Sequence, residues 1–260
     1  MTLERAYSVI NSILPVHITV DSFDVVKQVE EYRQFWKPKR LNVLLLAESH
    51  VYTRDEEYAL ECNKDFQDYF IKNYPTHFVR FVYCLCSGEP EMFSVKFKHK
   101  RHIQFWKIFC SCVANSSLNL GFEQIRKRET TLNQRLRNKV RILQEMHDRG
   151  IWLLDASIVG IYGAIKDHQI KQSVIRTCWK NHIQSTIAGF DPYPKAIVVI
   201  GKGVANSLNG YLDKLCDSMG TKCTVLPQPQ GNRGSSEEQM ETYRQYQRIC
   251  YKYAPPTDMR

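Results

Sequence analysis

Short apolar runs that end abruptly in polar residues recur along the chain. The clearest is Val43–Leu46, which runs into Ala47-Glu48-Ser49-His50. An uninterrupted apolar run of this length is typical of a strand buried on both faces. Such runs predict strands at 43–46, 151–157 and 196–201, with a shorter one at 222–226. An aromatic and β-branched segment, 78–85, predicts a further strand.

Helical periodicity fills the segments between these strands. Apolar residues recur every three to four positions over 132–148, without Pro or Gly, which predicts a helix that ends at Gly150. A last helix is predicted at about 237–253, with Ser235 or Ser236 as its N-cap. The other predicted helices lie within 1–36, at 54–73, at 103–113 and directly after 201.

Strands that alternate with helices predict a parallel sheet covered by helices on both faces. The expected fold class is therefore α/β, a three-layer α/β/α arrangement around a central, mostly parallel four-stranded sheet. The chain contains no internal repeat and no low-complexity linker, so we expect a single domain over residues 1–260.

The composition is ordinary for a globular protein, with 43% hydrophobic and 24% charged residues. No segment approaches the roughly 20 apolar residues that cross a bilayer. The first residues, Met1–Arg5, carry no basic region followed by an apolar one, so we expect a cytoplasmic protein without membrane association. The nine cysteines lack metal-binding spacing and are expected to be reduced and largely buried, and neither a metal nor a cofactor is expected.

The chain carries a net charge of +9, from 36 Lys and Arg against 27 Asp and Glu. A surplus of this size favours a polyanionic partner, most often nucleic acid. The surplus is concentrated in two clusters, Lys96–Arg101 and a longer series made of Arg126–Arg128, Arg135, Arg137, Lys139 and Arg141. The alternative is that both clusters are solvated faces without a ligand.

Polar side chains stand where the predicted strands end. Open α/β sheets place their ligands at the carboxyl ends of the strands. Glu48, Ser49 and His50 are therefore candidates for chemistry, and so is Asp155 near the end of the next strand. The alternative is that these residues form a polar loop beside the core.

Taken in order, four segments resemble the motifs of the uracil-DNA glycosylase superfamily. Leu44–His50 resembles the strand that delivers a water-activating acid, and Trp152–Ser157 resembles the strand that delivers a base-reading amide. Val198–Ala205 resembles the strand–Gly–Lys–helix segment that follows, and Pro227–Ser236 resembles a proline-rich loop that enters the DNA. The weight of the resemblance lies in the order of these segments.

The resemblance spans roughly residues 41–250 and implies an enzyme that acts on DNA. Such an enzyme takes the target base out of the stack and hydrolyses its N-glycosidic bond, leaving an abasic site. The resemblance makes 1–36 an N-terminal helical elaboration and 54–150 a long insertion-like segment. The expected partner is DNA, bound through its phosphate backbone and a flipped base, and the protein is expected to be a monomer.

The chain departs from the superfamily's motifs. Ala47–Val51 stands where the best-known branch has Gly-Gln-Asp-Pro-Tyr, and Glu48 matches branches that place a glutamate one position earlier than that aspartate. The histidine that usually opens the last motif is replaced by Leu226 or Gln228, depending on the alignment. Gly189–Pro194 imitates the first motif by its letters, but it precedes a predicted strand and its composition predicts a loop.

Asp155 stands where the superfamily commonly has an asparagine that reads uracil. An ionised aspartate only accepts hydrogen bonds, and cytosine presents an amino donor that suits such an acceptor. Because excision of ordinary cytosine would destroy the host genome, the expected target is a modified cytosine of phage DNA, hydroxymethylated or glucosylated, in antiviral defence. The alternative is that Asp155 caps the next helix or pairs with an arginine.

The resemblance assigns roles to the other candidates. Glu48 would activate the water, Asp155 would read the base, and Gln228 would donate to the departing base. The expected base pocket comprises Ser49, His50, Tyr52, Phe81, Tyr83 and Ser157. The expected DNA contacts are Lys202, Gln230, Asn232, Arg233 and Ser235.

Three functions stay open. The first is a glycosylase that acts on modified cytosine. The second is a repair glycosylase that removes uracil or another deaminated base. The third is a non-catalytic DNA-binding module of the same fold, which the missing imidazole favours. A nucleoside hydrolase is a more remote reading, because it would need no basic track for DNA.

Overall fold

A computed structural model describes residues 2–61, 71–93, 103–229 and 235–256. Its centre is a four-stranded sheet in the order β2-β1-β3-β4, and every pair of neighbouring strands is parallel. The strands are β1 (Val43–Ala47), β2 (Ile151–Asp155), β3 (Ala196–Ile200) and β4 (Lys222–Leu226). Val43 pairs with Ile151 on one side and with Ala196 on the other, so the strands end nearly in register.

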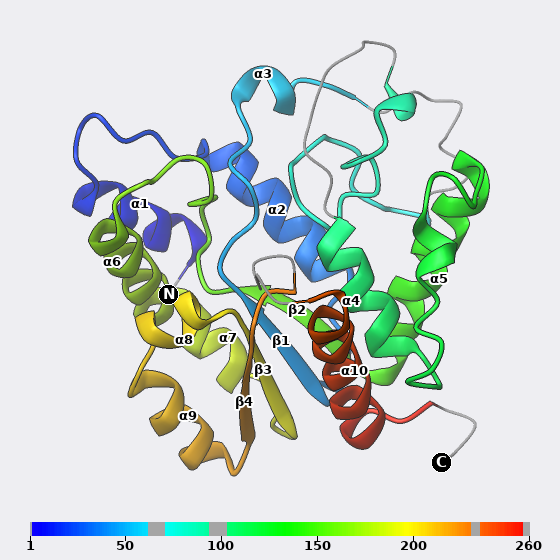
Figure 1. Cartoon of the computed structure of the whole chain (residues 1–260). Helices are drawn as coiled ribbons and strands as arrows, with labels where there is room; N and C mark the ends of the chain where they lie inside the picture. Colours follow the sequence, from blue (N-terminus) through cyan, green and yellow to red (C-terminus); the bar gives the residue numbers. More distant parts are fainter. Residues whose placement is uncertain (1, 62–70, 94–102, 230–234, 257–260) are drawn as a thin grey trace.

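Helices cover both faces of this sheet (Figure 1). The helices are α1 (Leu3–Ile13), α2 (Phe23–Phe35), α3 (Asp55–Tyr58), α4 (Ile103–Val113), α5 (Leu132–Arg149), α6 (His168–Cys178), α7 (Gln184–Ala188), α8 (Lys202–Ser207), α9 (Tyr211–Met219) and α10 (Ser236–Tyr253). The α1, α6, α8 and α9 helices lie on one side, and α4, α5 and α10 lie on the other (Figure 1). This is a three-layer α/β/α fold, so the predicted class is confirmed.

The strands form where the apolar runs predict them. Every residue of β1, β2 and β3 is buried, which is the environment that a parallel strand between two helical layers requires. The β4 strand lies at the edge of the sheet, and only its last residue, Leu226, is buried. The segment 189–194 precedes β3 and forms no strand or helix, as its composition predicts.

The two long helices predicted at 132–148 and 237–253 form as α5 and α10, with the predicted signals Gly150 and Ser235 at one end of each. The hydroxyl of Thr131 accepts from the backbone N–H of Gln134 at the start of α5, and Gly150 ends that helix in the left-handed conformation. The hydroxyl of Ser235 accepts from the N–H of Glu238 at the start of α10. The bounds of α4 coincide with the predicted segment 103–113. Among the described residues, no helix is long and apolar enough to cross a membrane.

The predicted strand at 78–85 is wrong. This segment is buried, but its backbone forms turns with local hydrogen bonds, such as Cys84 N–H to Phe81 O at 3.1 Å. Its aromatic and β-branched composition reflects burial, because such residues suit any apolar environment as well as a strand. The predicted helix at 54–73 is present only as α3, and residues 62–70 of it lie outside the described part of the chain.

The cysteines only partly follow the expectation of reduced thiols. Seven are free, and six of these are buried: Cys84, Cys110, Cys112, Cys178, Cys216 and Cys250, with Cys223 half-buried. Cys86 is disulfide-bonded, so the expectation of uniformly reduced thiols is wrong at that position. The spacing of cysteines along a chain carries no information on which of them approach one another in space.

We predict that alanine is tolerated much worse at Gly150 than at Gly220, although both glycines end a helix with positive φ, +72° and +62°. A Cβ at Gly150 would collide with the carbonyl oxygen of Arg40, whereas a Cβ at Gly220 meets nothing within 4 Å. Gly220→Ala therefore costs about 1 kcal/mol of backbone strain, and Gly150→Ala costs clearly more. Denaturant unfolding of both variants measures the difference, and equal losses would contradict the collision.

Candidate active site

The carboxyl ends of β1, β3 and β4 converge on one small region. Glu48 directly follows β1, Gly201 follows β3, and Gln228 lies two residues beyond β4. A Cβ built on Gly203 would lie 3.9 Å from Glu48 Oε1, and one on Gly201 would lie 3.4 Å from Gln228 Cγ. The glycines therefore leave room beside both side chains, at the edge where such sheets hold their ligands.

The carboxylate of Glu48 is available for chemistry. The side chain is half-buried, and among the residues that the structure describes it has no hydrogen bond and no ion pair. Its backbone carbonyl accepts from Ser157 N–H at 3.1 Å, which ties the residue to the end of β2. Glu48 thus combines a fixed backbone with a carboxylate that no described group neutralises.

Of the two residues that could replace the expected histidine, Gln228 and not Leu226 has its side chain at this edge of the sheet. Leu226 is the last residue of β4 and its side chain is buried at 4% exposure. Gln228 is half-buried and lies against Gly201, across the same region as Glu48. An amide at this position can donate a hydrogen bond but cannot carry a proton at neutral pH.

Asp155 belongs to a buried ion network. Its Oδ2 accepts from the guanidinium of Arg33 and from the backbone N–H of His50, each at 3.0 Å. The imidazole of His50 lies between two carboxylates, with Nε2 3.1 Å from Asp21 Oδ2 and Nδ1 3.4 Å from Asp155 Oδ2. The structure therefore realises the alternative in which Asp155 pairs with an arginine.

The environment keeps His50 and Asp155 charged at neutral pH. Burial disfavours the imidazolium, but the carboxylates of Asp21 and Asp155 outweigh it and raise the pKa of His50 to about 9. Burial likewise disfavours the Asp155 carboxylate, yet contacts with His50 and Arg33 lower its pKa below the usual value. The network is thus a chain of alternating charges, which is how buried ions are tolerated.

Asp21 anchors the far end of the network. Its Oδ1 accepts from Thr53 N–H at 2.7 Å, and its Oδ2 accepts from Gly160 N–H. A Cβ on Gly160 would come within 2.6 Å of Tyr52 N, so the two loops approach as closely as glycine allows. Asp21 therefore fixes the loop after β1 against the loop after β2.

Sequence reasoning missed Asp21 and Arg33. Arg33 follows Val29 by four residues, so it falls on the apolar face of the predicted helix, and a charge on that face is a signal for a buried partner. Asp21 directly precedes the N-cap of α2, Ser22, and so resembles an ordinary helix-capping residue. No local pattern distinguishes it from one.

A small cavity of about 30 Å³ adjoins Asp155 and brings together several predicted pocket residues. Ser49, His50 and Phe81 line it with Asp155, and Phe105 of α4 closes it. The hydrogen bonds of Asp155 to Arg33 and His50 both involve Oδ2, which leaves Oδ1 without a hydrogen bond among the described groups. The volume suits about one water molecule.

The other predicted pocket residues lie elsewhere. The hydroxyl of Tyr83 accepts from Leu153 N–H at 2.7 Å, and so completes the hydrogen bonds at the β2 edge. The hydroxyl of Ser157 donates to Val159 O at 2.8 Å within its own turn and is fully buried. Tyr52 is half-buried and does not line the cavity. These three residues have structural explanations.

The predicted DNA contacts are partly described. Lys202 is exposed at the start of α8, and Ser235 is exposed as the N-cap of α10. Gln230, Asn232 and Arg233 lie outside the described residues, as does the basic cluster Lys96–Arg101.

No protein family, curated protein or solved structure matches the chain. Functional inference therefore depends on the residues at the carboxyl edge of the sheet and on their geometry.

We predict that His50 makes the stability of the protein depend on pH. Because its pKa is about 9 in the folded state and about 6.5 unfolded, its contribution is complete below pH 6.5 and is lost as the pH rises through 9. The stability difference between the native protein and His50→Gln should shrink over this range by at most about 3 kcal/mol. Urea unfolding at several pH values measures it, with the exposed His17→Gln as control. A constant difference would contradict the network.

Proposed function

We propose that the protein is a DNA N-glycosylase, with Glu48 as the residue that activates water. The observation that supports this most directly is the unpaired, half-buried carboxylate of Glu48 at the carboxyl end of the central strand β1. The neighbouring charged groups of the sheet edge are already paired: His50 pairs with Asp155, and Asp155 also pairs with Arg33. Glu48 is thus the carboxylate that can meet a reacting sugar, and glycosidic bond cleavage generally employs a carboxylate near the anomeric carbon.

The reaction is a hydrolysis in which atoms and charges balance. Glu48 accepts a proton from water as the water oxygen bonds to C1′ of the sugar, and the bond between C1′ and the base nitrogen breaks. The base leaves with the electron pair and is protonated by solvent. Gln228, which lies against Gly201, donates its amide to the base and so stabilises the charge that develops there.

We assign base recognition to Asp155. Its Oδ2 is held by Arg33 and His50, while Oδ1 borders the cavity as a free acceptor for the amino group of a cytosine. Phe81 lines the same cavity, with Arg33 5.3 Å from its ring centre and His50 against its edge. The acceptor favours a modified cytosine as the target, and a uracil substrate would require an added donor.

Base binding also requires the cavity to open, because a base is several times larger than the one water molecule that the cavity suits. Phe105, a half-buried lining residue outside the network, is the side chain whose movement would enlarge it. The basic surplus and the exposed Lys202 supply the attraction for phosphate that DNA binding needs.

A non-catalytic DNA-binding module is the second candidate. The amide of Gln228 in place of an imidazole favours it, since an amide cannot hold the charge that a protonated histidine would. The two candidates differ in one result, the appearance of abasic sites in DNA.

We predict that Glu48→Gln lowers abasic-site formation by roughly 10²- to 10⁴-fold and leaves DNA binding unchanged, because the amide keeps the shape but cannot accept the proton. The exposed Glu56→Gln in α3 is the matched control and should keep full activity. The measurement counts alkali-sensitive sites in DNAs that contain uracil, cytosine, 5-hydroxymethylcytosine or its glucosylated form. Full activity of Glu48→Gln would refute the assignment, and no abasic sites in any DNA would favour the binding module.

We predict that Asp155→Asn moves the base preference from modified cytosine toward uracil, since an amide adds a donor for a uracil carbonyl. The same change removes one of the two counter-charges of Arg33 and of His50, which keep Glu30 and Asp21, and should cost up to about 3–5 kcal/mol of stability. The ratio of activities on the two bases, measured at a temperature where the variant is folded, separates these effects. A loss that is equal for all bases would show that Asp155 only supports the loop.

A further inference from the structure

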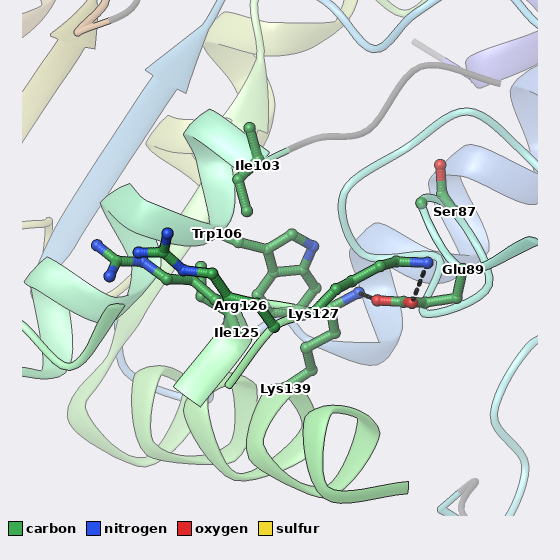
Figure 2. Close-up of a pocket in the computed structure, with 10 residues that line it drawn as sticks. Ser87, Glu89, Ile103, Trp106, Ile125, Arg126, Lys127 and Lys139 are labelled. Carbon is green, nitrogen blue, oxygen red and sulfur yellow. Dashed lines mark hydrogen bonds and ion pairs between the residues drawn. The ribbon is translucent and has the colours of Figure 1, made fainter. Parts of the chain in front are cut away.

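A second pocket lies beside the start of α4. It has a volume of about 370 Å³, within the range of pockets that bind small organic molecules. Its walls combine the apolar side chains of Ile103, Trp106 and Ile125 with the basic residues Arg126 and Lys127 (Figure 2). The α4 helix thus contributes Trp106 to this pocket and Phe105 to the cavity beside Asp155.

Glu89 is the acidic side chain among the described lining residues, and its carboxylate is already paired with cations of the protein. Arg135 donates to both of its oxygens, at 2.9 and 2.8 Å, and Lys139 donates at 2.7 Å. Lys127 lies 3.5 Å from the same carboxylate (Figure 2). Burial disfavours the charge, but Lys139 and Arg135 outweigh it and lower the pKa of Glu89 to about 2. Lys127 also donates to Glu91, at 2.6 and 2.9 Å, so three cations are shared by two carboxylates and a positive surplus of one charge remains among these described groups.

Arg126 adds a cation that has no acidic partner. Its guanidinium makes neither a hydrogen bond nor an ion pair within the described part of the chain. Lys107 is nearby and is likewise without a carboxylate, and burial together with the charge of Arg126 lowers the pKa of its ammonium. Two neighbouring cations repel each other, so an anion bound between them would be stabilised by both.

Two buried polar atoms of the lining also lack partners. The indole N–H of Trp106 and the hydroxyl of Ser87 make no hydrogen bond to any described group, although the residues are only 2% and 1% exposed. The indole nitrogen is on the side of the ring that faces Ser87 and Glu89 (Figure 2). An unsatisfied buried donor is costly, so this wall is adapted to a ligand that brings hydrogen-bond acceptors.

We propose that this pocket binds a small organic anion with a planar ring, of the chemical class of a nucleoside monophosphate. The ring packs against Ile103, Ile125 and Trp106, and one of its acceptor atoms takes the indole N–H. The phosphate binds Arg126, whose planar guanidinium matches two phosphate oxygens. The site is separate from Glu48 and does not depend on the proposed glycosylase activity.

Isothermal titration calorimetry of the full chain with the four deoxynucleoside monophosphates tests the proposal. At least one should bind, and the matching deoxynucleoside and inorganic phosphate should each bind at least about tenfold more weakly. Arg126→Gln should weaken binding about tenfold or more, and Trp106→Phe, which keeps a ring without the N–H, should weaken it severalfold. The exposed Lys214→Gln in α9 is the charge-matched control.

Each result decides the question. Failure of all four nucleotides to bind overturns the proposal, as does unchanged affinity in Arg126→Gln. Inorganic phosphate that binds as tightly as a nucleotide reduces the site to a simple anion site and refutes the ring. Ser87→Ala, a small change that preserves packing, should weaken binding if Trp106→Phe fails to fold. Glu48→Gln should bind nucleotide normally, and its loss of binding would place the nucleotide at the sheet edge instead.

Discussion

The buried ion network of Arg33, Asp155, His50 and Asp21 is the constraint on which the sheet edge depends. Charges closed off from water persist only where each has an opposite partner and its remaining atoms are hydrogen-bonded. Here the members come from α2, the end of β2, the loop after β1 and the segment before α2. Removal of any one takes a counter-charge away from its neighbours, so these segments are held in one arrangement and Glu48 is held with them.

The network also divides the polar residues of the sheet edge into two kinds. His50 is neutralised by two carboxylates and fully buried, so its task is to hold the loop. Glu48 and Gln228 have no such partners and lie where β1, β3 and β4 end. A reactive group needs a fixed position and a charge that is not already paired. Glu48 meets both conditions, because the neighbouring residues form the ion pairs that hold this part of the structure together.

The sequence predicts those features that local physics decides. Continuous apolar runs place β1, β2 and β3, and the signals at Thr131, Gly150 and Ser235 place helix ends, because these depend on residues close in the chain. The strand prediction at 78–85 is wrong because burial alone selected its residues. The partners Asp21 and Arg33 stand 134 and 122 positions from Asp155, and no periodicity carries information over such distances (155 − 21 and 155 − 33).

Net charge is an imperfect guide to a binding surface, because the sequence does not show which charges pair with distant residues inside the protein. The basic cluster at 126–141 predicts a surface that binds an anion. Arg135 and Lys139, however, are buried and form ion pairs with Glu89. The cations that stay unpaired among the described residues include Arg126 and Lys107 beside α4 and Lys202 at the sheet edge. An anion is attracted by the cations that are not paired with carboxylates of the protein. Among the described residues the surplus of +9 therefore includes at least two separate places, and the one at Lys202 directly precedes Gly203, the glycine that lies near Glu48.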